Sequence, residues 1–320
     1  MKTTTYLLKK LLSVVITLLI ISLLTFCVFQ ILPGNPAYII LGVDADPLQV
    51  QALSKEMGLD LPLHQRYIQW VIGLFNGDLG QSLRYQVPVI KLIRESLPVT
   101  VSLTVLSLLM TTVLVIPISI YLAKNNNKRL PTFISALMQV GIAVPSFWLA
   151  IMLIMVFAVA LRWFPSGDFI PYTQSVLGAI HSLVLPAAAI TIGTTAVVIR
   201  YLKNTLLDQM SMDYVRTARS KGLTKNKVLY VHVLKNALLP TITILGMIAV
   251  DVLGGSIIVE NVFNLPGIGR LITSGVGNRD FPLVQGLVFY LAFTVVVINF
   301  FVDLLYTVID PRIRLTKAKG

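Results

Sequence analysis

The sequence predicts an all-α integral membrane protein with six transmembrane helices, its N- and C-termini both in the cytoplasm. Of the 320 residues, 56% are hydrophobic and only 12% are charged, whereas about 25% of the residues in an ordinary soluble domain are charged. Several stretches reach the roughly 20 apolar residues that are needed to cross about 30 Å of hydrocarbon. The basic residues gather in segments that alternate with these stretches.

The six predicted spans run over 11–32, 97–123, 130–161, 169–199, 236–259 and 281–302. The first span exceeds the apolar region of a signal peptide, which has about 7–15 residues, so we expect it to remain in the protein. Prolines within spans mark expected kinks or broken turns, at Pro98, Pro117, Pro145 and Pro186. Gly141 also interrupts the third span.

The distribution of charge predicts the orientation. With the N-terminus inside, the cytoplasmic segments are 1–10, 124–129, 200–235 and 310–320. They hold 18 of the 26 Lys and Arg residues and three of the 14 Asp and Glu residues. The segments on the other side hold 8 basic and 9 acidic residues. This asymmetry orients membrane proteins, so the net charge of +12 reflects topology in the lipid bilayer, and we expect no nucleic acid partner.

The chain is expected to divide into three parts. Residues 1–96 hold the first span and a long extracytoplasmic loop, 97–310 form a core of five spans that contains the cytoplasmic loop 202–235, and 311–320 form a cytoplasmic tail. In the long loop, apolar residues at helical spacing predict an amphipathic helix over 63–74. Its apolar face would lie among the lipid headgroups or pack on other helices, and the sequence leaves both open.

Asp251 is the one ionisable residue near the middle of a span. A charge there costs at least ~2.5–3.5 kcal/mol on insertion scales, so we expect it to face a cavity or a partner. It would line a translocation path, or it would be protonated or paired across a subunit interface. The lone Cys27 and the dispersed histidines do not have the spacing of a zinc site, so we expect no metal site.

A polar, basic loop separates the fourth and fifth spans. Asp213 is a good N-cap for a short helix over 214–221, and Gly222 supplies the left-handed residue that ends a helix. Thr224 can begin a second helix over 225–235. Isolated helices below about 12–15 residues are marginal in water, so the first helix needs a docking surface.

The two faces of this short helix differ in chemistry. One carries a small or apolar ridge of Val215, Ala218 and Gly222. The other carries the positive residues Arg216, Arg219 and Lys221, which can meet carboxylates. We therefore expect the helix to sit in a groove of a soluble partner.

The loop resembles the cytoplasmic "EAA" loop of ATP-binding-cassette importer permeases, which reads Glu-Ala-Ala, three residues, Gly, nine residues and Ile-x-Leu-Pro. Arg216–Ala218, Gly222 and His232–Lys235 hold those places here, and the Glu, Ile and Pro are absent. The run 213–223 is similar instead to the peptide/nickel branch, which reads Asp-Tyr-x-Arg-Thr-Ala-Arg-x-Lys-Gly-Leu.

Further motifs extend this resemblance over nearly the whole chain. They are Leu32-Pro33-Gly34-Asn35-Pro36, Gly58–Leu63, Gly77–Ser82, Glu260, Phe263–Gly269, Asp280–Pro282 and Asp310–Arg314. Asn35 departs from the Asp that is commoner in the branch. In this order and on six spans, they resemble the first of the two permease subunits in dipeptide, oligopeptide and nickel importers.

The resemblance implies a permease subunit of the bacterial cytoplasmic membrane that is not itself an enzyme and forms half of a pathway for short peptides. The residues implied to couple to the ATPase are Asp213, Tyr214, Arg216, Thr217, Ala218, Arg219, Lys221 and Gly222. Asp251 and Glu260 are the candidates for the translocation path.

The implied partners are a second homologous permease, two ATP-binding subunits and an extracytoplasmic solute-binding protein. We expect no cofactor on this chain, with ATP and Mg²⁺ used by the ATPase subunits. The sequence agrees, because it contains no Gly-x4-Gly-Lys-Ser/Thr phosphate loop.

Other functions fit the sequence less well. The same importer type could carry nickel or metal chelates. An ATP-independent transporter or channel would show inverted repeats or several paired mid-span charges, and the sequence has only Asp251. An intramembrane hydrolase would need a nucleophile with its base or metal ligands, and neither His-x-x-x-His nor Gly-x-Ser-x-Gly occurs.

Overall fold

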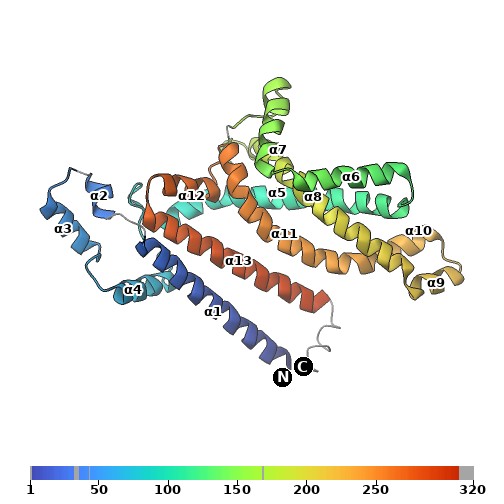
Figure 1. The fold of residues 1–320 in the computed structure, drawn as a ribbon, viewed down its shortest axis with the longest axis horizontal. Coiled ribbons are helices and arrows are strands. Elements are labelled where there is room, and N and C mark those ends of the chain that lie inside the picture. The colour runs from blue at the N-terminus through green and yellow to red at the C-terminus, as the bar shows by residue number, and fades with distance from the viewer. Residues whose placement is uncertain (1, 32–35, 43, 168, 310–320) are drawn as a thin grey trace. The chain divides into compact units, whose positions relative to one another are not determined.

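The computed structural model describes residues 2–31, 36–42, 44–167 and 169–309 (Figure 1). Helices account for most of this part of the chain, which also contains an isolated antiparallel bridge between Gln81 and Pro88. Five helices are long and apolar enough to cross a membrane, or up to six if one bent pair counts as a span. The prediction of an all-α membrane protein is therefore confirmed, while the orientation of the termini stays a prediction. The motif at 310–314, the tail 311–320 and most of the motif at 32–36 lie outside the described residues.

The chain folds into two compact units, one of residues 1–99 and 266–300 and the other of residues 100–265 and 301–320. The first contains α1 (Lys2–Ile31), α2 (Pro36–Leu41), α3 (Pro47–Glu56), α4 (Leu63–Phe75), α12 (Ile268–Gly277) and parts of α5 (Val89–Lys124) and α13 (Phe281–Ile309). The second contains the rest of α5 and α13, with α6 (Arg129–Ala143), α7 (Ser146–Leu153), η1 (Ile154–Ala160), α8 (Val176–Ser211), α9 (Asp213–Ser220), α10 (Lys225–Lys227), η2 (Val228–Val233) and α11 (Leu234–Val262). The predicted three-part division stays a prediction.

Helix α4 of the first unit packs on other helices through its aromatic side chains. The Tyr67 ring meets Phe26 of α1 at 5.3 Å between centroids, and Trp70 meets Phe289 of α13 at 5.7 Å. The Tyr67 hydroxyl also lies 2.9 Å from Ser22 Oγ. Packing is thus the alternative that the structure supports for this face. A second apolar side, which includes Phe75, is exposed and is available to lipid.

A buried carboxylate joins two motifs of the first unit that are far apart in sequence. Asp280 is 1% exposed and accepts a hydrogen bond from Ser82 Oγ. It also accepts bonds from the backbone amides of Leu83 at 3.1 Å and Arg84 at 3.2 Å. The amide of Leu283 donates to it at 3.3 Å, so the same carboxylate caps α13. Beside this contact lies a core of Leu79, Val89, Ile93, Ile268, Leu283 and Leu287.

Helix α8 is the central element of the second unit and packs against α6, α7 and α11 (Figure 1). Its buried side chains include several alanines, which allow neighbouring helices to approach closely. Both α8 and α5 extend past the predicted spans, to Ser211 and from Val89 respectively. The apolar pattern gives the membrane-embedded portion of a helix, and polar residues continue the same helix beyond it.

The break expected at Pro145 is confirmed, whereas the helices are not interrupted at the other span prolines. The predicted third span is a pair of helical segments, 129–143 and 146–160, bent by 103°. Pro145, in extended backbone, occupies the break. By contrast, helices run through the other prolines: Pro98 and Pro117 lie within α5, and Pro186 lies within α8.

Candidate functional site

The predicted short helix of the cytoplasmic loop is present as α9, with a different start. Met212 holds the N-cap position and makes no side-chain capping bond, so the prediction of Asp213 as N-cap is wrong. Asp213 is instead the first helical residue, where a negative charge interacts favourably with the helix dipole. Its carboxylate lies 3.7 Å from Arg216 Nη1, and both side chains are exposed.

Helix α9 ends where the sequence predicts. Gly222 adopts a φ of +84°, a conformation that glycine tolerates because it has no Cβ. The amide of Gly222 donates to the Arg219 carbonyl at 2.9 Å, and the amide of Leu223 donates to the Ala218 carbonyl at 3.3 Å. These two bonds form a Schellman motif, which satisfies carbonyls at the end of the helix.

The apolar side of α9 is covered by the chain itself. Val215 is 2% exposed, and α9 contacts both α8 and η2. The Tyr214 hydroxyl donates to Gln209 Oε1 of α8 at 2.9 Å. The expectation that the apolar ridge fills a groove in a partner is therefore corrected for Val215. The short helix needs a docking surface, and α8 and η2 provide it.

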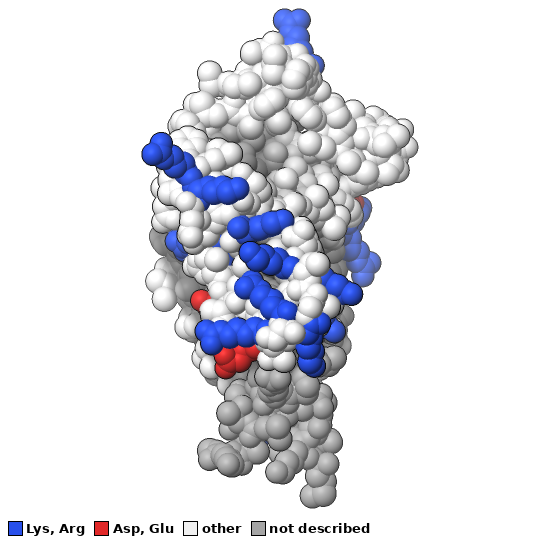
Figure 2. Space-filling model, turned by 90° about the vertical axis from the view of Figure 1, so that its right-hand side faces the viewer, with Lys and Arg blue, Asp and Glu red and all other residues white. Residues whose placement is uncertain are grey.

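The opposite side of α9 presents polar and charged groups to solvent. Among the predicted coupling residues, Tyr214 and Ala218 are half-buried, and the others are exposed: Asp213, Arg216, Thr217, Arg219, Lys221 and Gly222. Figure 2 shows Lys and Arg side chains gathered on this end of the molecule, with few acidic ones among them. Lys124 Nζ donates to Asn226 Oδ1 at 2.9 Å, so two of the predicted cytoplasmic segments meet here.

The second predicted helix of the loop is not a separate element. Thr224 Oγ1 accepts from the Lys227 amide at 3.4 Å and begins α10 as expected. From there α10, the π-helical segment η2 and α11 form a single helical stretch over Lys225–Val262. This stretch carries the loop directly into the membrane-embedded part of α11. Helix α11 runs through Pro240.

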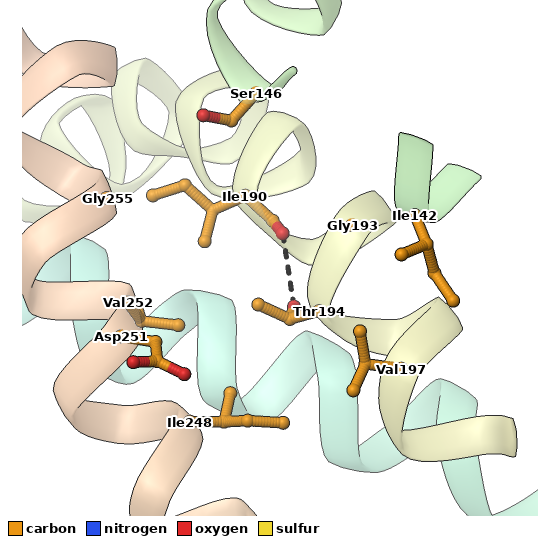
Figure 3. Close-up of a pocket in the computed structure, with 10 residues that line it drawn as sticks. All are labelled: Ile142, Ser146, Ile190, Gly193, Thr194, Val197, Ile248, Asp251, Val252 and Gly255. Atoms are coloured by element: carbon orange, nitrogen blue, oxygen red, sulfur yellow. Dashed lines mark hydrogen bonds between the residues drawn. The ribbon is translucent and has the colours of Figure 1, made fainter. Parts of the chain in front are cut away.

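A cavity of about 280 Å³ lies between the helices that extend from this loop. It is lined by Ile142 and Ser146 at the α6–α7 break, Ile190, Gly193, Thr194 and Val197 of α8, and Ile248, Asp251, Val252 and Gly255 of α11. In Figure 3 the side chains of α8 and α11 face each other across it. The Thr194 hydroxyl donates to the Ile190 carbonyl at 3.1 Å and lies 3.0 Å from Thr111 Oγ1.

Asp251 is exposed in this cavity. It makes no hydrogen bond or ion pair with any residue that the structure describes. Gly193 and Gly255 hold space open beside it, because a Cβ built on either would meet no atom within 4 Å. The sequence identified Asp251 by its charge but gave no signal for the hydroxyls and glycines around it.

Glu260, the other residue expected on the translocation path, is in a different environment. It is completely buried and accepts a hydrogen bond from Thr100 Oγ1 at 2.7 Å. It is not one of the residues that line the Asp251 cavity. Its backbone carbonyl accepts from the Leu265 amide at 2.8 Å, across a left-handed Asn264. In this structure Glu260 therefore fixes the end of α11 and is not open to a passage.

Comparison with known families shows the family of this chain. Residues 115–315 match the family described as binding-protein-dependent transport system inner membrane component, and residues 3–104 match the N-terminal region of such components. The chain therefore belongs to this family, the membrane permeases of ATP-binding-cassette importers. It is a multi-pass protein of the inner membrane.

Similar proteins align over nearly their full length. A "Putative peptide transport system permease protein" of Brucella abortus (strain 2308) is 40% identical over 311 residues, covering 97% of this chain and 99% of that protein. The oligopeptide transport system permease protein AppB of Bacillus subtilis (strain 168) is 34% identical over 312 residues, with the same coverage.

The fold also resembles a chain in an inward-facing structure of the MetNI methionine ABC transporter. The TM-score is 0.57 at 17% identity, over 69% of this chain and 97% of that one.

Proposed function

We propose that this permease carries short peptides and that α9 couples a separate ATPase to the cavity at Asp251. The peptide cargo is supported by the similar proteins, which are named as peptide permeases and match 97% of the chain at 40% and 34% identity. A nickel-carrying importer is the less supported alternative. The described residues contain no group of three or more His, Cys, Asp or Glu that could hold a metal ion.

The proposed coupling role rests on one observation: α9 is connected to both helices that line the cavity. Helix α8 lines the cavity and ends at Ser211, just before α9 begins at Asp213. Helix α11 lines the opposite side, and its continuous extension η2 packs against α9. A displacement of α9 would therefore move both walls. The short helix has the position of a mechanical link between a cytoplasmic partner and the cavity.

The exposed side of α9 fits a partner with acidic groups. The exposed side chains of Arg216, Arg219 and Lys221 would meet carboxylates of an ATP-binding subunit. ATP and Mg²⁺ would be bound by that subunit and not by this chain. To drive transport, the ATPase must bind one conformation of the permease more tightly than the other, because a ligand with equal affinity for both shifts nothing.

The remaining partners complete the importer. A second homologous permease would supply the other half of the pathway, and two ATPase subunits would each engage one permease. A solute-binding protein would deliver peptide to the extracytoplasmic loops. In the first unit, the Asp280 carboxylate fixes the loop at 82–84, which would give such a protein a rigid surface.

Site-specific cross-linking tests the position of the ATPase. Cys27 is the only cysteine of the chain, so Cys27→Ala gives a background in which Thr217→Cys places one thiol on the exposed side of α9. We expect this thiol to cross-link to an ATPase subunit in the assembled importer. Leu177→Cys, at the other end of α8, is the exposed control and should not cross-link. An importer that retains ATP-driven uptake but gives no product at Thr217→Cys would overturn the coupling assignment.

A further inference from the structure

The cavity between α8 and α11 combines one ionisable side chain with otherwise apolar or hydroxyl-bearing walls. Asp251 is the only Asp, Glu, Lys, Arg or His among the residues that line it. The sequence segments that supply the walls reinforce this isolation, because 130–161 and 169–199 contain no charge and 236–259 contains only Asp251. A carboxylate here acts on the cavity with little competition from other charges.

The carboxylate has no cationic partner in the part of the chain that the structure describes. A charge in a membrane-embedded site is normally compensated by a partner or by a water-filled cavity. In the low-dielectric surroundings of a span, a positive group that enters the cavity is attracted more strongly than it would be in bulk water. The empty space at Gly193 and Gly255 allows such a group to approach.

The ligand chemistry favours an organic ammonium over a metal ion. Divalent metals take several oxygen, nitrogen or sulfur ligands, and the described residues hold no group of three or more His, Cys, Asp or Glu that could bind one. One carboxylate suffices for an ammonium group, which has a single charge and forms charge-assisted hydrogen bonds.

We propose that Asp251 binds the α-ammonium group of the peptide cargo during its passage, an inference that rests on the proposed peptide function. The volume of about 280 Å³ is near the lower end of ligand pockets, which span about 300–1,000 Å³. It therefore fits one end of a short peptide. Every peptide with a free N-terminus carries this ammonium group, so one carboxylate would serve cargo of many sequences.

Charge-selective labelling in the assembled importer tests the local field. In the Cys27→Ala background, Thr194→Cys places a thiol in the cavity beside Asp251. Its rates of modification are measured with a cationic trimethylammonium-ethyl and an anionic sulfonato-ethyl methanethiosulfonate. We expect the cationic reagent to react about tenfold faster, relative to its reaction with a free thiol, from attraction at an intermediate dielectric. Asp251→Asn should abolish this preference, and a preference that survives Asp251→Asn would overturn the proposal.

Uptake of the cargo tests the ligand itself. Vesicles that contain the complete importer are supplied with ATP, the solute-binding protein and trialanine. We expect Asp251→Asn to lower the uptake rate about tenfold and Asp251→Glu to restore part of it, with unchanged recovery of the complex. Wild-type uptake in Asp251→Asn would overturn the proposal. Loss of the complex in Asp251→Asn but not in Asp251→Glu would also overturn it, because the carboxylate would then hold a subunit interface.

The two assays separate this proposal from the peptide function on which it rests. If the wild-type importer accumulates no trialanine, the proposed peptide cargo is wrong, whatever Asp251 does. If the wild-type importer accumulates trialanine and the Asp251 variants behave like it, the peptide function stands and only the ammonium site is overturned.

Discussion

Replacing Gly222 with valine should uncouple ATP hydrolysis from peptide uptake. Gly222 has a φ of +84°, and a residue with a Cβ costs about 1–2 kcal/mol in the left-handed region, with β-branched residues the least tolerant. A Cβ at this position meets no atom within 4 Å, so the effect comes from the backbone alone and not from a steric clash.

The backbone cost acts on the end of α9. A change of 1–2 kcal/mol alters the ratio of two states by a factor of about 5–30. The favoured alternative would lose the bonds from the Gly222 and Leu223 amides to the Arg219 and Ala218 carbonyls. Helix α9 would then spend less time in its fixed position against α8 and η2, while the membrane-embedded helices stay intact.

The assay is the number of ATP molecules hydrolysed per peptide accumulated in vesicles that contain the complete importer. Gly222→Val should raise this number several-fold at normal recovery of the complex. Gly222→Asn is the matched control, because asparagine adopts the left-handed conformation more readily than other residues with a Cβ, and it should stay close to wild type. Unchanged coupling in the valine variant, or equal uncoupling in both variants, would refute the proposal that coupling depends on the left-handed conformation of residue 222 at the end of α9.

Three further predictions concern charge, space and the outer loop. Charge reversal by Arg216→Glu or Arg219→Glu should lower the amount of ATPase that co-purifies with the permease. Lys55→Glu in α3 is the control and should not lower it. Equal amounts of co-purified ATPase in all three variants would contradict the proposed pairing. Gly193→Val should slow trialanine uptake by filling the cavity, since a Cβ added at Gly193 meets no atom within 4 Å. Gly193→Ala should stabilise α8 by about 0.5–1 kcal/mol. Faster uptake in the valine variant would argue against a passage at this cavity. Asp280→Ala removes a carboxylate that accepts hydrogen bonds from Ser82 and three amides, each worth about 1.5–3 kcal/mol. Limited proteolysis should therefore cut the loop at 82–84 faster in this variant. An unchanged cleavage rate would contradict the proposal that Asp280 holds this loop in place.

The sequence predicted features that depend on local composition and conformation. Apolar length located the membrane helices, and Gly222 indicated the end of α9 because a left-handed residue has a local chemical requirement. The basic loop was recognised from the same local pattern. These features depend on residues within a few positions of each other, so one chain suffices to identify them.

Features that depend on distant contacts were missed or misread. Val215 was expected to face a partner, but α8 and η2 bury it, and its spacing alone cannot distinguish the two. The expectation that Glu260 lies on the translocation path stays a prediction, but its bond to Thr100, 160 residues away, gives no signal in a single sequence. Three of the four groups that donate to Asp280, on Ser82, Leu83 and Arg84, lie almost 200 residues away in sequence. The extension of α11 into the loop was missed because the polar residues 225–235 differ in composition from the apolar span, although both belong to one helical stretch.

The most direct test of the account compares vesicles with and without the ATPase subunits. Both samples contain this permease, its partner permease, the solute-binding protein, labelled trialanine outside and ATP at the cytoplasmic face. We expect the peptide to accumulate against its gradient only when the ATPase subunits are present and ATP is hydrolysed. Accumulation of the same size without those subunits would contradict the coupling role, because transport would then need no ATPase movement transmitted through α9.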